Sequence, residues 1–329
     1  MDAEDLSYDA DSRIDTITLS KNLKRVKVKG VRQRGERFCA SLKLVNNMMI
    51  LPRVLLSIGH LGRVMAFYET KAAILATLSQ EREDDYQEQY RKELDELMES
   101  QFLPEQEKIA EQTEEGGKQA FLDLLNKDAN VGKTYEAILY SGIVWIWCSF
   151  EVLARELWEC ALNAGGRYLG KTVIKKLPSK NGIRDKLRSK FISLDYLAQY
   201  DYDLSKSLGT ALVNKFDFTS CNGISEAYSC AFPKSADIKN ALKNKKISDL
   251  EATRNVIVHN AGFIDVAYCK RTAASVTDVG KRLKLSNRKV SEYGNAAIDA
   301  GLAIMLSVSS NLLYAKATAR KVAASSSSD

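Results

Sequence analysis

Proline and histidine are scarce in this chain of 329 amino acids, which contains four Pro, two His and 18 Gly. Four prolines are far below the roughly 5% of average usage. A β-sandwich or a loop-rich enzyme needs more turn residues than this, so the scarcity favours helices. The two histidines restrict the chemistry, because imidazole catalysis would have to use His60 or His259, and a zinc site would need cysteine or carboxylate ligands.

The sequence also lacks paired cysteines, a secretion signal and a long apolar run. None of the six cysteines forms a Cys-x-x-Cys pair, which excludes zinc-ribbon and thioredoxin-type motifs. Cys148 and Cys160 lie in apolar sequence, so we expect buried thiols. The first residues are acidic, and the longest apolar stretch, about 137–150, contains Ser141 and is followed by Glu151. We therefore expect a reduced, cytoplasmic protein with no membrane contact and no metal or other cofactor.

Charge is strongly segregated along the chain, although the net charge is only +6. Residues 81–116 hold 14 acidic and 4 basic side chains, whereas residues 21–37 and 171–190 each hold eight basic side chains and one acidic side chain. Such segregation suits either a polyanion-binding surface with a separate acidic arm or ordinary solvated faces. The two basic segments contain few aromatic residues, so they favour contacts with the RNA backbone over base stacking.

The hydrophobic pattern predicts an all-α fold that begins with an N-terminal extension at 1–130. Residues 21–64 fit either short strands, at Arg25 to Val28 and Phe38 to Leu44, or irregular helix. From about 65 to 102 apolar residues recur mostly every four positions; Pro104 ends this stripe, and a second helix follows toward Leu125. We expect these two helices to form a charged hairpin that regulates the protein or binds a partner.

A helical domain is predicted at 131–320, before a disordered tail at 321–329. Residues 135–162 are apolar over a wide arc and are the best candidate for a central core helix, which Gly165-Gly166 should stop. Further helices are expected at 183–200, 248–259 and 291–316.

The segment Gly165-Gly166-Arg167-Tyr168-Leu169-Gly170-Lys171-Thr172 fits the phosphate-binding P-loop pattern. A P-loop follows a buried strand and opens a helix, whereas here a long amphipathic helix precedes the motif and Pro178 soon follows. A nucleotidase that uses Lys171 would need magnesium-dependent ATP binding. The context favours a helix stop followed by a basic turn.

The segment Glu251-Ala252-Thr253-Arg254-Asn255-Val256-Ile257-Val258-His259-Asn260 carries the most chemical information. On a helix, Arg254 falls inside an apolar arc, which is costly unless Glu251, a facing subunit or a phosphate meets its charge. His259 lies in the last turn, where the helix dipole favours imidazolium. A phosphate clamp, an amide and a proton-transfer group on one helix edge suit phosphodiester cleavage, and the alternative is a core histidine beside a Glu251–Arg254 bridge.

At these residues the chain resembles the HEPN superfamily, the helical ribonucleases with an Arg-x4–6-His signature. Arg254-Asn255-Val256-Ile257-Val258-His259 matches that signature, and Asn260-Ala261-Gly262-Phe263-Ile264-Asp265 with Tyr268 resembles the continuation common in prokaryotic members. The segment Gly280-Lys281-Arg282-Leu283-Lys284-Leu285-Ser286 is similar to the one that leads into the final HEPN helix. The resemblance covers roughly 134–316 as an order of helices, but only about 40 residues carry the motif.

The resemblance implies a helical bundle that forms a homodimer or higher homo-oligomer, with two motifs facing one cleft. It implies metal-independent cleavage of single-stranded RNA, in which a 2′-OH attack leaves 2′,3′-cyclic phosphate and 5′-OH ends. Arg254 would stabilise the phosphate, His259 would transfer protons, and Asn255 would orient the histidine or the substrate. Glu251, outside the signature, would support Arg254 or Asn255. Family members often act as toxins or antiviral effectors; others are non-catalytic scaffolds that bind RNA, nucleotide or a partner protein, and this remains the alternative.

Overall fold

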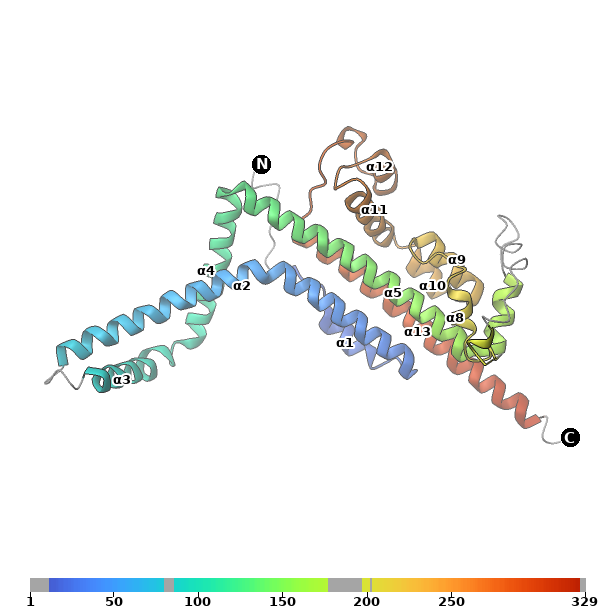
Figure 1. Cartoon of the computed structure of the whole chain (residues 1–329), viewed down its shortest axis with the longest axis horizontal. Coiled ribbons are helices and arrows are strands. Elements are labelled where there is room, and N and C mark those ends of the chain that lie inside the picture. Colours follow the sequence, from blue (N-terminus) through green and yellow to red (C-terminus); the bar gives the residue numbers. More distant parts are fainter. Residues whose placement is uncertain (1–11, 80–85, 177–196, 202, 326–329) are drawn as a thin grey trace. The chain divides into compact units, whose positions relative to one another are not determined.

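The computed structural model describes residues 12–79, 86–176, 197–201 and 203–325, and over these residues the predicted all-α class is confirmed. The only β pairing in the described part is an isolated antiparallel bridge between Phe263 and Arg282. The elements are α1 (Thr16–Leu23), α2 (Lys29–Ser79), α3 (Tyr86–Leu97), the π-helix η3 (Met98–Phe102), α4 (Gln106–Lys127), α5 (Ala129–Lys176), α8 (Leu208–Val213), α9 (Cys221–Ala231), α10 (Ala236–Leu242), α11 (Lys245–His259), α12 (Val266–Thr272), the 3-10 helix η4 (Val276–Asp278) and α13 (Asn287–Ser325) (Figure 1).

The chain divides into two compact units. The first contains Asn47–Ile138, and the second combines Ser12–Asn46 with the described residues from Leu139 onward. Residues 12–46 therefore pack with the C-terminal helices, although the prediction placed them in the N-terminal extension at 1–130. The long helices α2 and α5 each contribute to both units.

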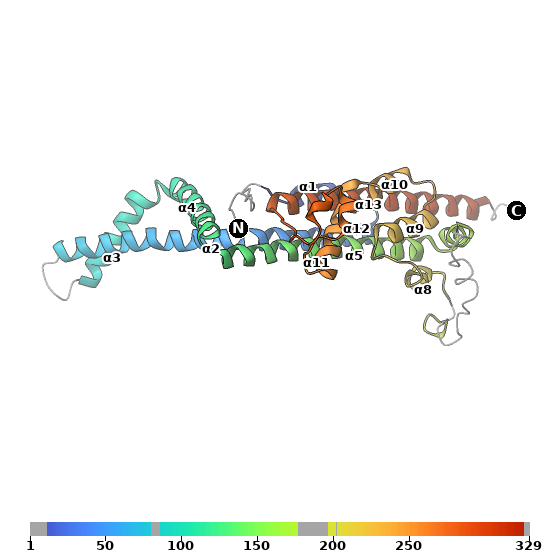
Figure 2. The same cartoon turned by 90° about the horizontal axis from the view of Figure 1, so that it is seen from above.

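The second unit is built around α5, which confirms the predicted core helix at 135–162. Its buried residues recur at helical spacing and include Leu139, Ile143, Ile146, Trp147, Phe150, Leu153, Leu157 and Trp158. In both views α13 runs alongside α5 (Figures 1 and 2), and Gly301 of α13 packs closely on Leu153 of α5 and Phe38 of α2. Helix α9 closes the other side of α5: the Trp158 indole donates to the carbonyl oxygen of Ala227 at 2.9 Å, and the Tyr228 hydroxyl donates to that of Ala154 at 2.8 Å.

Of the two alternatives for 21–64, short strands are wrong and helix is right, because this segment is helical from Lys29 onward. The buried residues Val31, Phe38, Leu42 and Val45 are separated by seven, four and three positions, which is the spacing of one helix face. Basic residues between these positions obscure the pattern in the sequence, and they occupy the exposed side of α2. Part of the basic segment 21–37 is neutralised, since both Arg34 and Arg37 pair with Glu156 of α5.

In the first unit, the stretch expected to form one helix of a charged hairpin is divided between two helices. The helix expected over 65–102 is instead the end of α2 followed by α3, and these two helices pack on each other: Tyr68 and Ala72 of α2 form a small apolar cluster with Leu97 of α3. Helix α4, which begins after Pro104 as expected, packs on α2 through Gly117, whose missing side chain leaves room for the backbone of Ser57.

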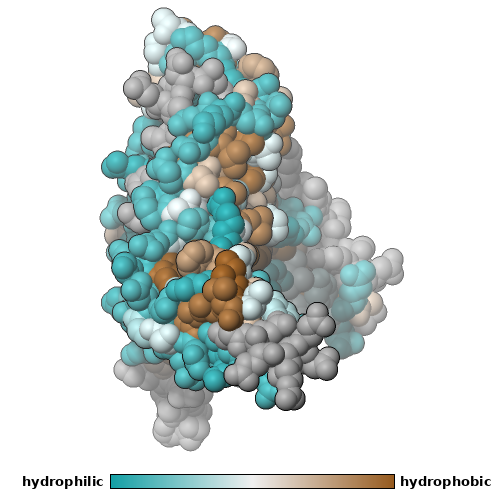
Figure 3. All heavy atoms as spheres, turned by 90° about the vertical axis from the view of Figure 1, so that its left-hand side faces the viewer, coloured by the Kyte–Doolittle hydropathy of each residue, from teal (hydrophilic) through white to brown (hydrophobic). Residues whose placement is uncertain are grey.

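Among the described residues, three helices are long and apolar enough to cross a membrane by length and composition: Lys29–Leu78, Ala129–Gly166 and Asn287–Ala315. About half of the apolar window is buried in the second and third, but only 6% of it in the first. Exposed apolar residues of α2 include Leu51, Val54, Leu55, Ile58, Leu61 and Phe67. Figure 3, which faces the far end of α2, shows apolar side chains gathered at the surface among hydrophilic ones. Cytoplasmic localisation stays a prediction.

The P-loop-like segment 165–172 lies inside α5, with helix on both sides. Gly166 has a non-helical backbone (φ 44°, ψ −129°) that interrupts α5 at the expected stop, and a second helical stretch then runs to Lys176. The expectation that a helix rather than a strand precedes this motif is confirmed. Pro178, most of the basic segment 171–190 and most of the helix expected at 183–200 lie outside the described residues.

Candidate functional site

Helix α11 carries all the predicted site residues, and its formation over Lys245–His259 confirms the helix expected at 248–259. The Asn244 side chain caps its start by accepting from the Lys246 backbone N–H at 2.9 Å. One face, with Ile247, Leu250 and Val256, is buried against α9, α12 and α13. This packing fixes the rotation of α11, and it leaves Arg254 half-buried and His259 exposed.

Arg254 and Asn255 are in direct contact. The Arg254 Nη1 donates to Asn255 Oδ1 at 3.0 Å, one of the five N–H donors that a guanidinium carries. The Arg254 Nε is buried and has no hydrogen-bond partner among the described residues. A buried donor without a partner is costly, and the low accessibility of Nε leaves the outer nitrogens of this guanidinium as the groups that could meet an acceptor.

The guanidinium of Arg254 faces α5, where its charge acts on Glu151 and Cys148. Burial raises the pKa of the Glu151 carboxyl above its usual range, Asp217 raises it further, and Arg254 and Arg155 oppose the shift. Glu151 was not among the predicted site residues. The sequence feature that could have identified Glu151 is its position as a carboxylate among the apolar residues of the core helix.

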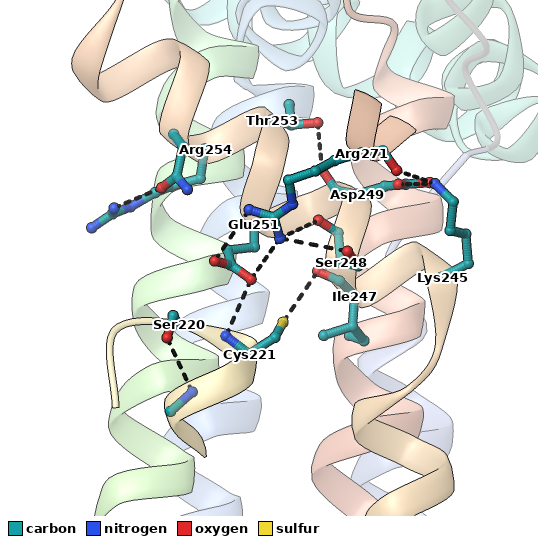
Figure 4. A network of polar contacts seen from close by, with 12 residues as sticks. Ser220, Cys221, Lys245, Ile247, Ser248, Asp249, Glu251, Thr253, Arg254 and Arg271 are labelled. Carbon is teal, nitrogen blue, oxygen red and sulfur yellow. Dashed lines mark hydrogen bonds and ion pairs between the residues drawn. The ribbon is translucent and has the colours of Figure 1, made fainter. Parts of the chain in front are cut away.

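Glu251 does not support Arg254 or Asn255 as predicted. It is buried and forms an ion pair with Arg271 of α12 (2.8 Å between Oε2 and Nη2), and the same oxygen accepts the Cys221 backbone N–H at the start of α9 at 3.1 Å (Figure 4). Burial alone would raise the pKa of Glu251, but these hydrogen bonds hold it below its usual range. Arg271 also donates to Ser248 (Figure 4). Glu251 therefore joins three helices behind the site.

His259 is the last residue of α11 and is exposed. In the described part of the chain its imidazole forms no hydrogen bond or ion pair, so both ring nitrogens are available. The structure thus places Arg254 and Asn255 together and His259 one turn further along the same helix, while Glu251 lies on the buried side. The alternative of a core histidine with a Glu251–Arg254 bridge is wrong on both counts.

The residues after His259 form a tight loop. Gly262, with a φ of 83°, donates its N–H to Val256 O and closes the helix. The Asn260 side chain donates to Asp265 Oδ2 at 2.7 Å, and the other oxygen of Asp265 caps α12. The motif residues Asn260, Gly262 and Asp265 therefore have structural roles that hold the loop next to His259.

Apolar side chains on α5 and α11 are exposed around this edge. Val258 of α11 is 48% exposed, and Trp145 and Val152 of α5 are 45% and 52% exposed. Cys148, expected to be buried, is exposed on the same face of α5, and Cys160 is half-buried. The wide apolar arc of α5 therefore serves two purposes: one side packs in the core, and the other remains open beside Arg254.

No group of three or more His, Cys, Asp or Glu side chains that could hold a metal occurs among the residues described. Comparison of the chain with protein-family models, with curated proteins and with solved structures finds no match.

Proposed function

We propose that this chain is a metal-independent endoribonuclease of the HEPN type that cleaves single-stranded RNA, acting as a toxin or antiviral defence effector. The observation that carries the proposal is the Arg254–Asn255 contact on a helix that ends in an exposed, uncommitted His259. A guanidinium with free donors suits a phosphate, and an imidazole exchanges protons in the physiological pH range.

The proposed reaction requires only groups that this edge supplies. A ribose 2′-OH loses its proton to a base, O2′ attacks the adjacent phosphorus, and the P–O2′ bond forms as the P–O5′ bond breaks. The leaving O5′ takes a proton, so the products carry 2′,3′-cyclic phosphate and 5′-OH ends, and no water is consumed. In this proposal His259 transfers protons, Arg254 stabilises the negative charge that builds up on the phosphate oxygens, and Asn255 orients Arg254 through the observed hydrogen bond.

A homodimer fits the exposed apolar side chains beside Arg254. Burying Trp145, Val152 and Val258 against a second copy would remove apolar surface from water. In a two-fold interface the same patch contacts itself, so two copies of the Arg254 and His259 edge would lie close together. Two imidazoles in one cleft would allow one to act as the base and the other as the acid.

The second candidate is a non-catalytic HEPN scaffold that binds RNA, nucleotide or a partner protein. It is favoured by the state of His259, because a catalytic base is ordinarily oriented by a further group and none of the described residues holds this imidazole. This candidate predicts that Arg254→Ala and His259→Ala alter binding while no product forms.

The test is incubation of labelled single-stranded RNA with the purified full chain in excess EDTA. We expect cleavage by the wild type and a loss on the order of 100-fold or more in His259→Ala, the scale of a lost proton-transfer group. His60→Ala is the matched control, because it removes the only other histidine, which lies in the first unit beside Gly116. Cleavage that survives in His259→Ala, or is lost equally in His60→Ala, would refute the proposal. In cells, wild-type expression should slow growth and His259→Ala should not.

A further inference from the structure

The loop that follows His259 is paired with a second segment, residues 280–285, which leads into α13. The N–H of Ile264 donates to Lys281 O at 2.9 Å, and the N–H of Leu283 donates to Gly262 O at 2.8 Å. Phe263 and Arg282 face each other across this pairing. We call residues 262–264 with 280–285 the paired loop. Its position is fixed within a few residues of the candidate proton-transfer group.

Side chains alternate along the paired loop as they do along a strand. Leu283 and Leu285 are buried, each 4% exposed, whereas Arg282 and Lys284 point to solvent. Directly opposed residues of an antiparallel pair project from the same face, so Phe263 shares the outer face with Arg282. The Phe263 ring is 48% exposed there. An aromatic ring and two cations therefore occupy one outward face.

A buried tyrosine fixes the guanidinium on this face. The Arg282 Cζ lies 5.6 Å from the centre of the Tyr140 ring, a cation–π contact. The Tyr140 hydroxyl donates to Leu283 O at 2.5 Å, and Gly262 packs on the same ring, where a Cβ would approach to 2.6 Å. The paired loop and Tyr140 thus form one rigid support.

We propose that Phe263 and Arg282 form a stacking platform for a base of single-stranded RNA next to the cleaved phosphodiester, with Lys284 contacting a neighbouring phosphate. This inference rests on the proposed function, and it names the subsite that positions the substrate. Proteins that recognise single-stranded RNA stack bases on aromatic rings and on guanidinium planes, and backbone phosphates attract lysine. The platform reads no particular base, so it predicts broad sequence tolerance.

The test measures binding of a fluorescent single-stranded RNA to the full chain carrying His259→Ala, which keeps the RNA intact. In that background Phe263→Ala should weaken binding roughly 10-fold, as expected for one lost base stack, and Phe263→Trp should restore it. Phe67→Ala is the matched control, since Phe67 is 62% exposed in the first unit, and it should leave the affinity unchanged. Thermal unfolding of each variant verifies that it folds.

Salt dependence separates the two roles. Lys284→Ala should reduce the slope of log affinity against log salt by about 0.7, the value for one phosphate contact on a single strand, whereas Phe263→Ala should leave the slope unchanged. The platform is overturned if folded Phe263→Ala binds as tightly as its parent, if Phe67→Ala weakens binding equally, or if the parent binds no RNA because the face serves a protein partner.

Failure of the platform is distinguishable from failure of the proposed function. If the wild type cleaves RNA while Phe263→Ala leaves both affinity and KM unchanged, the platform fails and the ribonuclease stands. If RNA binding depends on Phe263 while the wild type forms no product, the platform stands and the catalytic proposal fails.

Discussion

Substitution of Arg271 by methionine tests whether the Glu251 network holds α11 in place. Methionine keeps most of the apolar stem but removes the guanidinium that meets a carboxylate only 8% exposed. Removal of one partner of a buried pair costs about 3–5 kcal/mol, because the other charge stays buried and uncompensated. Since Arg271 is itself 35% exposed, solvent weakens the interaction, and we expect a loss of about 2 kcal/mol at pH 7.

The pH dependence of this loss identifies its origin. The folded-state pKa of Glu251 is lowered, so the ion pair stabilises the fold above the unfolded pKa of a glutamate, about 4.3, and this stability disappears as the pH falls through the folded pKa. The difference between wild type and Arg271→Met should therefore be full at pH 7 and should shrink below about pH 4.

The assay is urea unfolding followed by helical circular dichroism at both pH values. Arg288→Met is the matched control, because Arg288 is 69% exposed and pairs with Glu292 on the surface of α13. We expect less than about 0.5 kcal/mol for this control. The claim that the Glu251 network holds α11 is refuted if Arg271→Met lowers the free energy of unfolding no more than Arg288→Met does. It is also refuted if the decrease at pH 3 equals the decrease at pH 7.

Three further predictions follow from the site. Gly262→Ala should lower the melting temperature measured by calorimetry far more than Gly280→Ala. Both glycines have a φ near +82°, but only a Cβ on Gly262 would meet Tyr140, at 2.6 Å, so equal decreases in melting temperature would contradict this prediction. Glu151→Gln should raise the free energy of urea unfolding at pH 7, because the raised pKa of folded Glu151 means that its ionisation opposes folding above the unfolded pKa. A lower free energy of unfolding would show that the attraction between Glu151 and Arg254 dominates. Val258→Glu should shift sedimentation toward the monomer, and an unchanged mass would exclude this face as the dimer contact.

Local periodicity made part of the fold predictable. The core helix at 135–162 and the site helix at 248–259 are recognisable because most of their apolar residues follow the helical period. The N-terminal half of α2 was not recognisable as a helix from the sequence. Basic residues such as Arg32, Arg34 and Arg37 separate its buried positions, so the pattern resembles the alternation of short strands. Its burial is decided by α5 and α13, which are distant in the sequence.

The same limit applies to the site. The placement of Arg254, Asn255 and His259 on one helix edge follows from spacing alone. The partner of Glu251 cannot be found from spacing, because Arg271 lies 20 residues further along the chain. Helix geometry identifies only nearby residues, such as Arg254, as candidate partners. The role of the continuation after His259 became clear only from the structure, where Asn260, Gly262 and Asp265 form the hydrogen bonds that close the loop.

The most direct test of the central claim is the chemistry of the ends formed from a defined single-stranded RNA in EDTA, determined by mass spectrometry. The account predicts 2′,3′-cyclic phosphate and 5′-OH ends from the wild type, no product from His259→Ala, and no cut at a position where a single ribose is replaced by 2′-deoxyribose. Products with 3′-OH ends, or a cut at the 2′-deoxy position, would show that O2′ is not the nucleophile and would contradict the roles given to His259 and Arg254.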